Sequence, residues 1–197
     1  MTSLPTRPLI LASTSVYRRQ LLERLHLPFS VVGSHVDETP LPDEAPPEIA
    51  CRLALAKARS VAQANPGAVV IGSDQVADLD GHALGKPGSH ARAVAQLRTM
   101  RGKTVVFQTA VAEVCLESGF AQTELARIKV RFRDLSDAQI ETYLLAEQPY
   151  DCAGSAKSEG LGIALLERID NDDPTALIGL PLIRTYRLLE AAGVKVL

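Results

Sequence analysis

The chain has 197 residues, of which 46% are hydrophobic and 22% are charged, and its formal net charge is -2. This length and composition predict a soluble globular chain with one substantial core or two lobes that share a cleft, and they exclude an intrinsically disordered protein. The lack of net positive charge argues against a partner that is a nucleic-acid polymer, because such binding needs a basic face to neutralise many phosphates.

Cysteine usage and the N-terminal segment predict a cytoplasmic protein. Cys51, Cys115 and Cys152 are odd in number, widely separated and without metal-ligand spacing, which indicates reduced thiols and neither a disulfide framework nor a zinc site. Residues 1–8 lack the apolar core of a signal peptide, and no uninterrupted apolar run reaches transmembrane length. We therefore expect no membrane association.

Residues 9–22 predict a strand, a tight turn and a helix. The apolar run ends in the hydroxyl residues 13–15 and is followed by helical spacing, with Arg18 and Arg19 in the first turn. A helix start offers unpaired backbone N–H groups to an anion, and guanidinium groups add bidentate donors for phosphate. Two arginines also oppose the helix dipole, which indicates an anionic ligand. The alternative is an ordinary N-cap, with Ser13 or Ser15 bonding an amide and the arginines in solvent.

The next stretch predicts an acidic loop followed by a long helix. A short strand is expected over residues 28–32, and the Pro-rich segment 36–40 carries Glu38. An alanine-rich helix is expected from Pro46 to about residue 65, with Lys57 near its middle. Lys57 in isolation is better explained as a surface lysine whose stem covers apolar side chains.

Residues 68–72 form a continuous apolar run that is typical of a strand buried on both faces, and the run ends in Ser73, Asp74 and Gln75. A carboxylate at the end of a buried strand is unfavourable unless it is capped, paired or bound to a metal, and open α/β sheets bind ligands at the carboxyl ends of strands. The alternative is that Asp74 caps the following turn.

The remainder predicts a long hairpin, further helices and a glycine-rich segment. The segment 152–162, which carries Glu159, permits close approach of the backbone to a ligand. We find neither a linker nor a repeat, so residues 1–197 are expected to form one unit with two lobes. Lys86 lies on a glycine-flanked loop at 85–88, which does not have the pattern of a Walker A loop. In chain order, the other expected elements are a hairpin turn at 80–81, a helix from Ser89 to about 101, strands over 103–116 and 120–132, a helix over 136–147, a strand over 163–169 and a helix over 181–192.

These polar groups suit one chemistry. Two carboxylates can hold a hard divalent cation, while arginine and lysine bind a polyphosphate and neutralise charge on a leaving pyrophosphate. Attack of water on an α-phosphate follows, and no Ser-His-Asp or Cys-His arrangement competes with it. The candidate residues are Ser13, Arg18, Arg19, Glu38, Lys57, Asp74 and Lys86.

The sequence resembles the Maf family of nucleoside triphosphate pyrophosphatases almost from end to end. The matching blocks, in order, are LILASTSVYRRQLL, VDETP, LALAKA, IGSDQV, GKP, CAGSAKSEGLG and GLPL. The resemblance implies an α/β fold with an elongated mixed central sheet flanked by helices, similar to the inosine triphosphate pyrophosphatase fold, and an active-site cleft between two lobes. It also implies a divalent metal cofactor, Mg, Mn or Co. The oligomeric state is left open, including a homodimer.

By this resemblance Asp74 is the proton acceptor and also, with Glu38, a metal-binding residue. Catalytic roles are further implied for Glu38, Lys57 and Lys86. The residues expected to bind the phosphates are Ser13, Arg18 and Arg19.

Three positions distinguish branches of the family, and in this chain they hold Tyr17, Gln75 and Glu159. The branch acting on dTTP and UTP typically has arginine, threonine and glutamine. This chain is similar to the branch that hydrolyses 7-methyl-GTP to 7-methyl-GMP and pyrophosphate, which has an aromatic residue, often tryptophan, followed by glutamine and glutamate. N7-methylation makes the purine cationic, which favours an aromatic face and a carboxylate that accepts from guanine N–H groups.

Two other functions remain open at this point. One is the same reaction on standard nucleotides such as dTTP and UTP. The other is a non-catalytic nucleotide-binding regulator linked to septum formation, which the family's association with that process suggests. The presence of Glu38 and Asp74 together with all the cationic partners disfavours a regulator, because binding without turnover does not need a base beside a metal.

Overall fold

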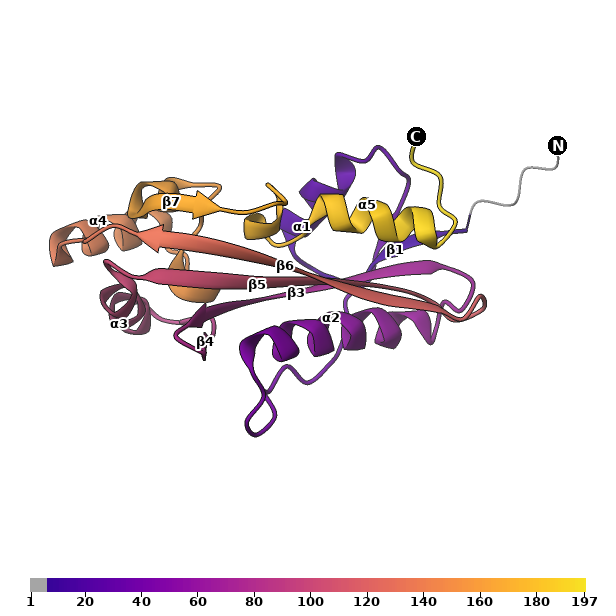
Figure 1. The fold of residues 1–197 in the computed structure, drawn as a ribbon, viewed down its shortest axis with the longest axis horizontal. Helices are drawn as coiled ribbons and strands as arrows, with labels where there is room; N and C mark the ends of the chain where they lie inside the picture. The colour runs from indigo at the N-terminus through magenta and orange to yellow at the C-terminus, as the bar shows by residue number, and fades with distance from the viewer. Residues whose placement is uncertain (1–6) are drawn as a thin grey trace.

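The structure, a computed structural model that describes residues 7–197, is built on a seven-stranded mixed sheet (Figure 1). The strand order is β2-β1-β3-β5-β6-β7, and β4 pairs with the far end of β3. β1 is parallel to both of its neighbours, while the other pairs are antiparallel. The strands are β1 Leu9–Leu11, β2 Ser30–Val31, β3 Val69–Leu79, β4 His82–Leu84, β5 Thr104–Cys115, β6 Phe120–Phe132 and β7 Leu166–Asp170.

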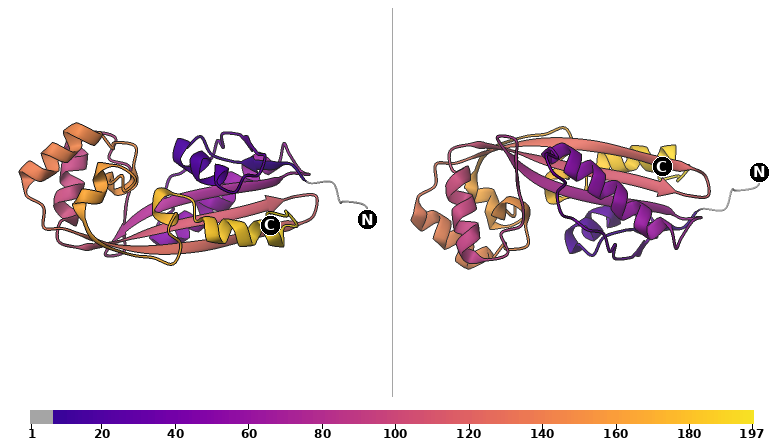
Figure 2. Two further views of the ribbon diagram at one scale, coloured as in Figure 1. Left: turned by 90° about the horizontal axis from the view of Figure 1, so that it is seen from above. Right: turned by 90° about the horizontal axis from the view of Figure 1, so that it is seen from below.

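Five α-helices surround this sheet in two groups (Figures 1 and 2). α2 packs on one face, α1 and α5 pack on the opposite face, and α3 and α4 gather at the far end of the molecule. None of the helices in the described part of the chain is long and apolar enough to span a membrane. The helices are α1 Val16–Glu23, α2 Pro46–Ala62, α3 His90–Met100, α4 Asp137–Glu147 and α5 Leu182–Ala191, with short 3-10 turns at Ala153–Ser155, Leu161–Leu165 and Ala176–Ile178.

The long strands β3, β5 and β6 carry the apolar cores of both ends of the molecule. Near the termini the sheet is covered by two separate clusters, one under α2 and one under α1 and α5, while a third cluster lies under α3 and α4. The same three strands contribute residues to more than one of these clusters. The fold is therefore the elongated, two-lobed mixed sheet with flanking helices that the resemblance implied.

Alternation along β3 decides which side of the sheet receives each polar residue. Successive side chains of a strand point to opposite faces. Val70, Gly72 and Asp74 face α2, while Ser73 and Gln75 face the turn at 176–179. One strand segment thus delivers three neighbouring polar groups to two different faces.

The apolar run predicted that Asp74 lies at the end of a strand, but in the structure Asp74 lies in the middle of β3. β3 continues to Leu79 because β5 pairs with it without interruption over residues 70–78. The parallel neighbour β1, however, stops at Leu11, which is paired with Ile71. The edge of β3 has no neighbouring strand from that point until β4 pairs with Ala77.

Most of the other expected elements are present with small changes in their limits. The Asp80-Gly81 turn joins β3 to β4 with positive φ at both positions, as a two-residue hairpin requires. Ser89 and Ser136 cap α3 and α4 as predicted. The predicted strand over 163–169 is partly wrong, because residues 161–165 form a 3-10 turn and β7 begins at Leu166. The expected strand over 28–32 is reduced to residues 30–31.

We expect Gly72→Ala to destabilise the protein by about 1 to 3 kcal/mol, because overpacking at a close backbone contact forces α2 away from β3. A Cβ atom at Gly72 would overlap the carbonyl oxygen of Ala54 and lie 2.6 Å from the amide nitrogen of Ala58. Denaturant unfolding checks this, with Gly85→Ala as the control because nothing lies within 4 Å of a Cβ there. Equal midpoints for the wild type and Gly72→Ala would contradict close packing at this point.

Candidate active site

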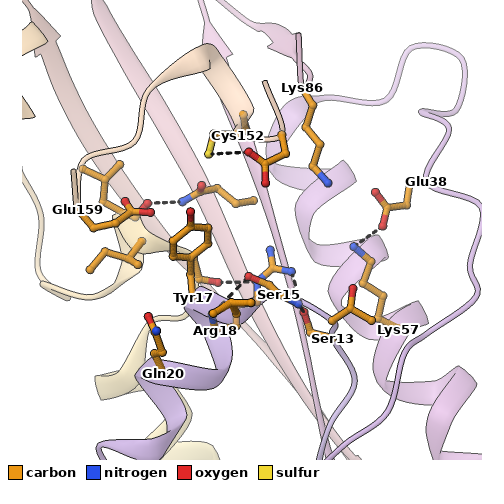
Figure 3. Close-up of a pocket in the computed structure, with 18 of the residues that line it drawn as sticks. Ser13, Ser15, Tyr17, Arg18, Gln20, Glu38, Lys57, Lys86, Cys152 and Glu159 are labelled. Carbon is orange, nitrogen blue, oxygen red and sulfur yellow. Dashed lines mark hydrogen bonds and ion pairs between the residues drawn. The ribbon is translucent and has the colours of Figure 1, made fainter. Parts of the chain in front are cut away.

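A pocket of about 600 Å³ lies beside the open edge of β3. Its walls come from segments far apart in the chain: the β1–α1 turn and the start of α1, the loop that carries Glu38, the loop that carries Lys86, and the segments 151–159 and 177–179. The side chains that line it point inward from both lobes (Figure 3). This is the cleft between two lobes that the sequence led us to expect.

The β1–α1 turn combines capping with presentation of a cation. Ser15 is the N-cap of α1 and accepts from the backbone N–H of Arg18 at 3.4 Å. Ser13, which is buried, accepts from the Arg18 guanidinium at 3.4 Å, and Arg18 Nε donates to the carbonyl oxygen of Gly179 at 2.9 Å. A guanidinium has five N–H donors, so donors remain for a ligand. The capping and ligand-binding readings of this turn are therefore compatible.

Arg18 and Arg19 diverge in spite of being adjacent. Burial lowers the pKa of the Arg18 guanidinium, and the nearby carboxylates of Asp74 and Glu38 oppose this. Arg19 is exposed, forms an ion pair with Glu23 at 3.0 Å one turn along α1, and does not line the pocket. Successive helical residues point about 100° apart, and here Arg18 points to the cleft while Arg19 points along the helix to Glu23. The expected phosphate contact from Arg19 is therefore not supported.

Lys57 is the centre of an ionic triad. Its Nζ lies 2.7 Å from Oδ1 of Asp74 and 2.6 Å from Oε1 of Glu38. Lys57 and Asp74 are buried, with 6% and 7% of their surface exposed, whereas Glu38 is about half exposed. This excludes the alternative of a surface lysine, because the ammonium points inward from α2 to join two carboxylates from separate elements.

The triad separates the pKa values of its two carboxyl groups. Burial raises the pKa of Asp74, although the charges of Lys57 and Arg18 oppose the shift. Glu38 is also partly desolvated, but the hydrogen bond and charge of Lys57, together with the charge of Lys86, bring its pKa below the usual value. Asp74 is thus the better proton acceptor near neutral pH, and Glu38 stays ionised.

Glu38 and Asp74 form a donor set that suits a magnesium-like ion bound with a polyphosphate. Such ions are usually held by one or two carboxylates together with substrate phosphates and water. No group of three His, Cys, Asp or Glu residues that could hold a metal occurs within residues 7–197. Glu38 lines the pocket, but Asp74 lies behind Lys57 and is not part of the pocket wall. A site with two carboxylates, both already paired with Lys57, suits a divalent cation that binds together with the substrate phosphates.

The other end of the pocket contains the three positions expected to recognise the base. Gln75 Nε2 donates to Oγ1 of Thr109 at 2.9 Å and approaches the carbonyl oxygens of Ala176 and Leu177 at 3.1 and 3.0 Å. The amide nitrogen is thereby occupied, which leaves the Gln75 side-chain oxygen as an acceptor. Glu159 lies beside Tyr17 (Figure 3), and burial raises the pKa of its carboxyl group.

Asp151, Cys152 and Gly179 are pocket residues to which the sequence assigned no role. Asp151 and Cys152 line the wall next to Lys86, and burial raises the pKa of the Cys152 thiol to about 12, so it stays protonated. The carbonyl of Gly179 joins Arg18 to Ser73, whose hydroxyl donates to it at 2.9 Å. Gly179 has φ +124, which favours glycine. Its only signal in the sequence was its place in the GLPL block.

Comparisons with known proteins identify the family of this chain. A family model described as Maf-like protein matches residues 8–192. The 7-methyl-GTP pyrophosphatase of Polaromonas sp. strain JS666 is 73% identical over 189 residues, which cover 96% of this chain and 86% of that protein.

Two further relatives have the same name. The 7-methyl-GTP pyrophosphatase of Albidiferax ferrireducens is 70% identical over 191 residues, or 97% of this chain and 96% of the relative. That of Burkholderia pseudomallei is 61% identical over 188 residues, or 94% and 87%. Because the match extends over both lobes and every wall of the pocket, the chain belongs to the Maf family.

Proposed function

We propose that this protein hydrolyses 7-methyl-GTP to 7-methyl-GMP and pyrophosphate by attack of water on the α-phosphate. The observation that carries the proposal is the buried Lys57 bound to Asp74 and Glu38 in a pocket whose other end contains Tyr17 and Glu159. The first group suits hydrolysis of a phosphoanhydride, and the second suits a cationic purine. The substrate named for the relatives supports this choice.

The phosphate end supplies a base and three cations. Asp74 takes a proton from the attacking water, and its raised pKa brings it closer to the range in which a general base is effective. The new bond forms between the water oxygen and the α-phosphorus, and the bond to the bridging oxygen breaks. Arg18 and Lys86 neutralise charge on the departing pyrophosphate, while Lys57 keeps Asp74 oriented.

We further propose a divalent cation, Mg, Mn or Co, held by Glu38 and Asp74 together with phosphate oxygens. Such an ion would supply positive charge that polarises the phosphoryl group. Lys57 Nζ contacts one oxygen of each carboxylate, so both carboxylates point toward a common region of positive charge.

The base end offers acceptors to a ring that presents donors. Gln75 offers its side-chain oxygen and Glu159 offers a carboxylate, while guanine has N1–H and N2–H donors on one edge. Tyr17 supplies a π face for the ring made cationic by N7-methylation.

We place the reaction in the cytoplasm, and the three unpaired cysteines support this.

The direct test is pyrophosphate release from 7-methyl-GTP, GTP, dTTP and UTP, with Asp74→Asn as the companion variant. We expect 7-methyl-GTP to give the highest kcat/KM. We also expect Asp74→Asn to lose activity by about two to four orders of magnitude, because the amide keeps the shape but cannot accept a proton. Preferred turnover of dTTP or UTP would overturn the substrate assignment, and tight nucleotide binding without turnover would favour a regulator.

Lys57→Met is expected to move the acidic limb of the pH profile to higher pH. The base acts when it is ionised, so kcat/KM rises with pH through the pKa of Asp74. Lys57 lowers that pKa, and its removal therefore raises it further. The measurement is kcat/KM against pH, with exposed Lys103→Met as the control. A limb that stays in place or moves to lower pH would show that Asp74 is not the titrating base.

Glu159→Gln should reduce the preference for 7-methyl-GTP over GTP by about tenfold, because only the N7-methylated base carries the positive charge that the carboxylate attracts, and tenfold corresponds to about 1.4 kcal/mol. The amide keeps the shape of the side chain but loses the charge that favours a cationic base. The ratio of the two kcat/KM values measures this, and Glu167→Gln, at an exposed site on β7 outside the pocket, is the control. An unchanged ratio would remove Glu159 from base recognition.

A further inference from the structure

A second ionic cluster lies directly behind the base end of the pocket. Lys157 Nζ lies 2.7 Å from Oε1 of Glu147 and 5.6 Å from the centre of the Tyr17 ring. Neither Glu147 nor Lys157 lines the pocket. A cation over an aromatic ring is attracted to the π face, and here that ring is the one placed against the base.

Glu147, the last residue of α4, also closes the loop that presents Glu159. Its second oxygen, Oε2, accepts from the backbone N–H of Leu161 at 2.8 Å, so the one carboxylate holds both residue 157 and residue 161. A Cβ atom at Gly160 would lie 2.8 Å from both Glu147 oxygens. The backbone N–H of Lys157 donates to the hydroxyl of Tyr143 on the preceding turn of α4 at 3.0 Å. Glu159 is therefore presented from a loop fixed at both ends.

The charges of this cluster determine the potential experienced by the base. The side chains of Lys157 and Glu147 are 25% and 15% exposed, and the Lys157 ammonium holds the pKa of the Glu147 carboxyl below its usual value, so both are ionised at neutral pH. Lys157 alone would repel a cationic base across the Tyr17 ring. With Glu147 present the pair is neutral overall, so Lys157 offsets less of the negative charge that the Glu159 carboxylate presents to the pocket.

We infer that Glu147 is a positioning residue for substrate selection, which neutralises Lys157 at the Tyr17 ring and fixes the 157–161 loop, so that the pocket favours a cationic purine over a neutral one. The inference rests on the proposed function in taking the base as the group that is selected. The phosphate end lies at the opposite wall and does not contact this pair.

Three variants of the full-length protein test the charge balance, with kcat and KM measured for 7-methyl-GTP and GTP. Glu147→Gln keeps the acceptor for the Leu161 amide but leaves Lys157 uncompensated. It should lower the ratio of the two kcat/KM values about three- to tenfold, mainly through KM for 7-methyl-GTP. Lys157→Met should raise the ratio. The double variant is neutral again and should return to within about twofold of the wild type.

Glu141→Gln is the matched control, because Glu141 also lies on α4 and pairs with His90 at 3.0 Å, away from the pocket. An unchanged ratio in Glu147→Gln overturns the inference. A ratio that falls but is not restored in the double variant also overturns it, because the role of Glu147 is then only to hold the loop. Should Glu147→Gln fail to fold, Lys157→Met still decides, and a ratio that does not rise contradicts the inference.

Failure of the proposed function is recognised separately. A wild-type protein that releases no pyrophosphate from any nucleotide defeats the proposed reaction. Calorimetric affinities for 7-methyl-GMP and GMP in the same four proteins then decide the inference, with the same directions expected. Equal affinity of the wild type for the two monophosphates overturns it.

Discussion

The contact between Lys57 and two carboxylates is the interaction on which the site depends. Removing an ammonium and a carboxylate from water is unfavourable, and such a pair persists only when geometry and hydrogen bonds are good. The geometry is supplied by backbone packing, because Gly72 lets α2 approach β3 so closely that no Cβ fits between them. Asp74 lies two residues after Gly72, on the same face of β3, and contacts Lys57. A helix-to-sheet contact thus fixes the relative position of the proposed base and its counter-ion.

The early end of β1 provides access to this contact. β1 pairs with β3 only as far as Ile71, and α1 follows after a short loop. Arg18, in the first turn of α1, points toward the cleft. Ser73, on the opposite face of β3, donates to the same Gly179 carbonyl that accepts from Arg18. Asp74 and Ser73, on opposite faces of one strand, therefore hold two pocket residues in place, Lys57 and Gly179. The turn at 176–179 connects the phosphate end of the pocket to its base end.

Two loops that carry site carboxylates are secured by ion pairs with helices. Arg52 on α2 binds the carboxylate of Glu44 and donates to the carbonyl of Thr39 at 3.2 Å, which closes the loop around Glu38. On the other lobe, Glu147 on α4 closes the loop around Glu159. These ion pairs fix the ends of both loops before a ligand binds, which lowers the entropic cost of binding.

Local pattern was sufficient for most of the elements and for the identity of the polar candidates. Apolar periodicity, capping serines and the Asp80-Gly81 turn depend on neighbours in sequence, so they predicted α2, α3, α4, α5 and the long β5–β6 hairpin. The chemistry of Asp74 was also predictable, because a carboxylate beside a buried apolar run needs a partner of opposite charge, whereas Lys57 in isolation was better explained as a surface lysine. The family blocks then ordered these candidates into one site.

The tertiary structure alone decided which candidates meet. The end of β3 could not be predicted, because its extension to Leu79 depends on pairing with β5, more than 25 residues away in sequence. Adjacent arginines gave the same signal, yet helix rotation directs Arg18 to the cleft and Arg19 to Glu23. Glu147 gave no signal, since its partners Lys157 and Leu161 come from a loop whose path follows from packing against α4. Sequence determined the chemical groups, and long-range packing determined their distances and therefore their charge states.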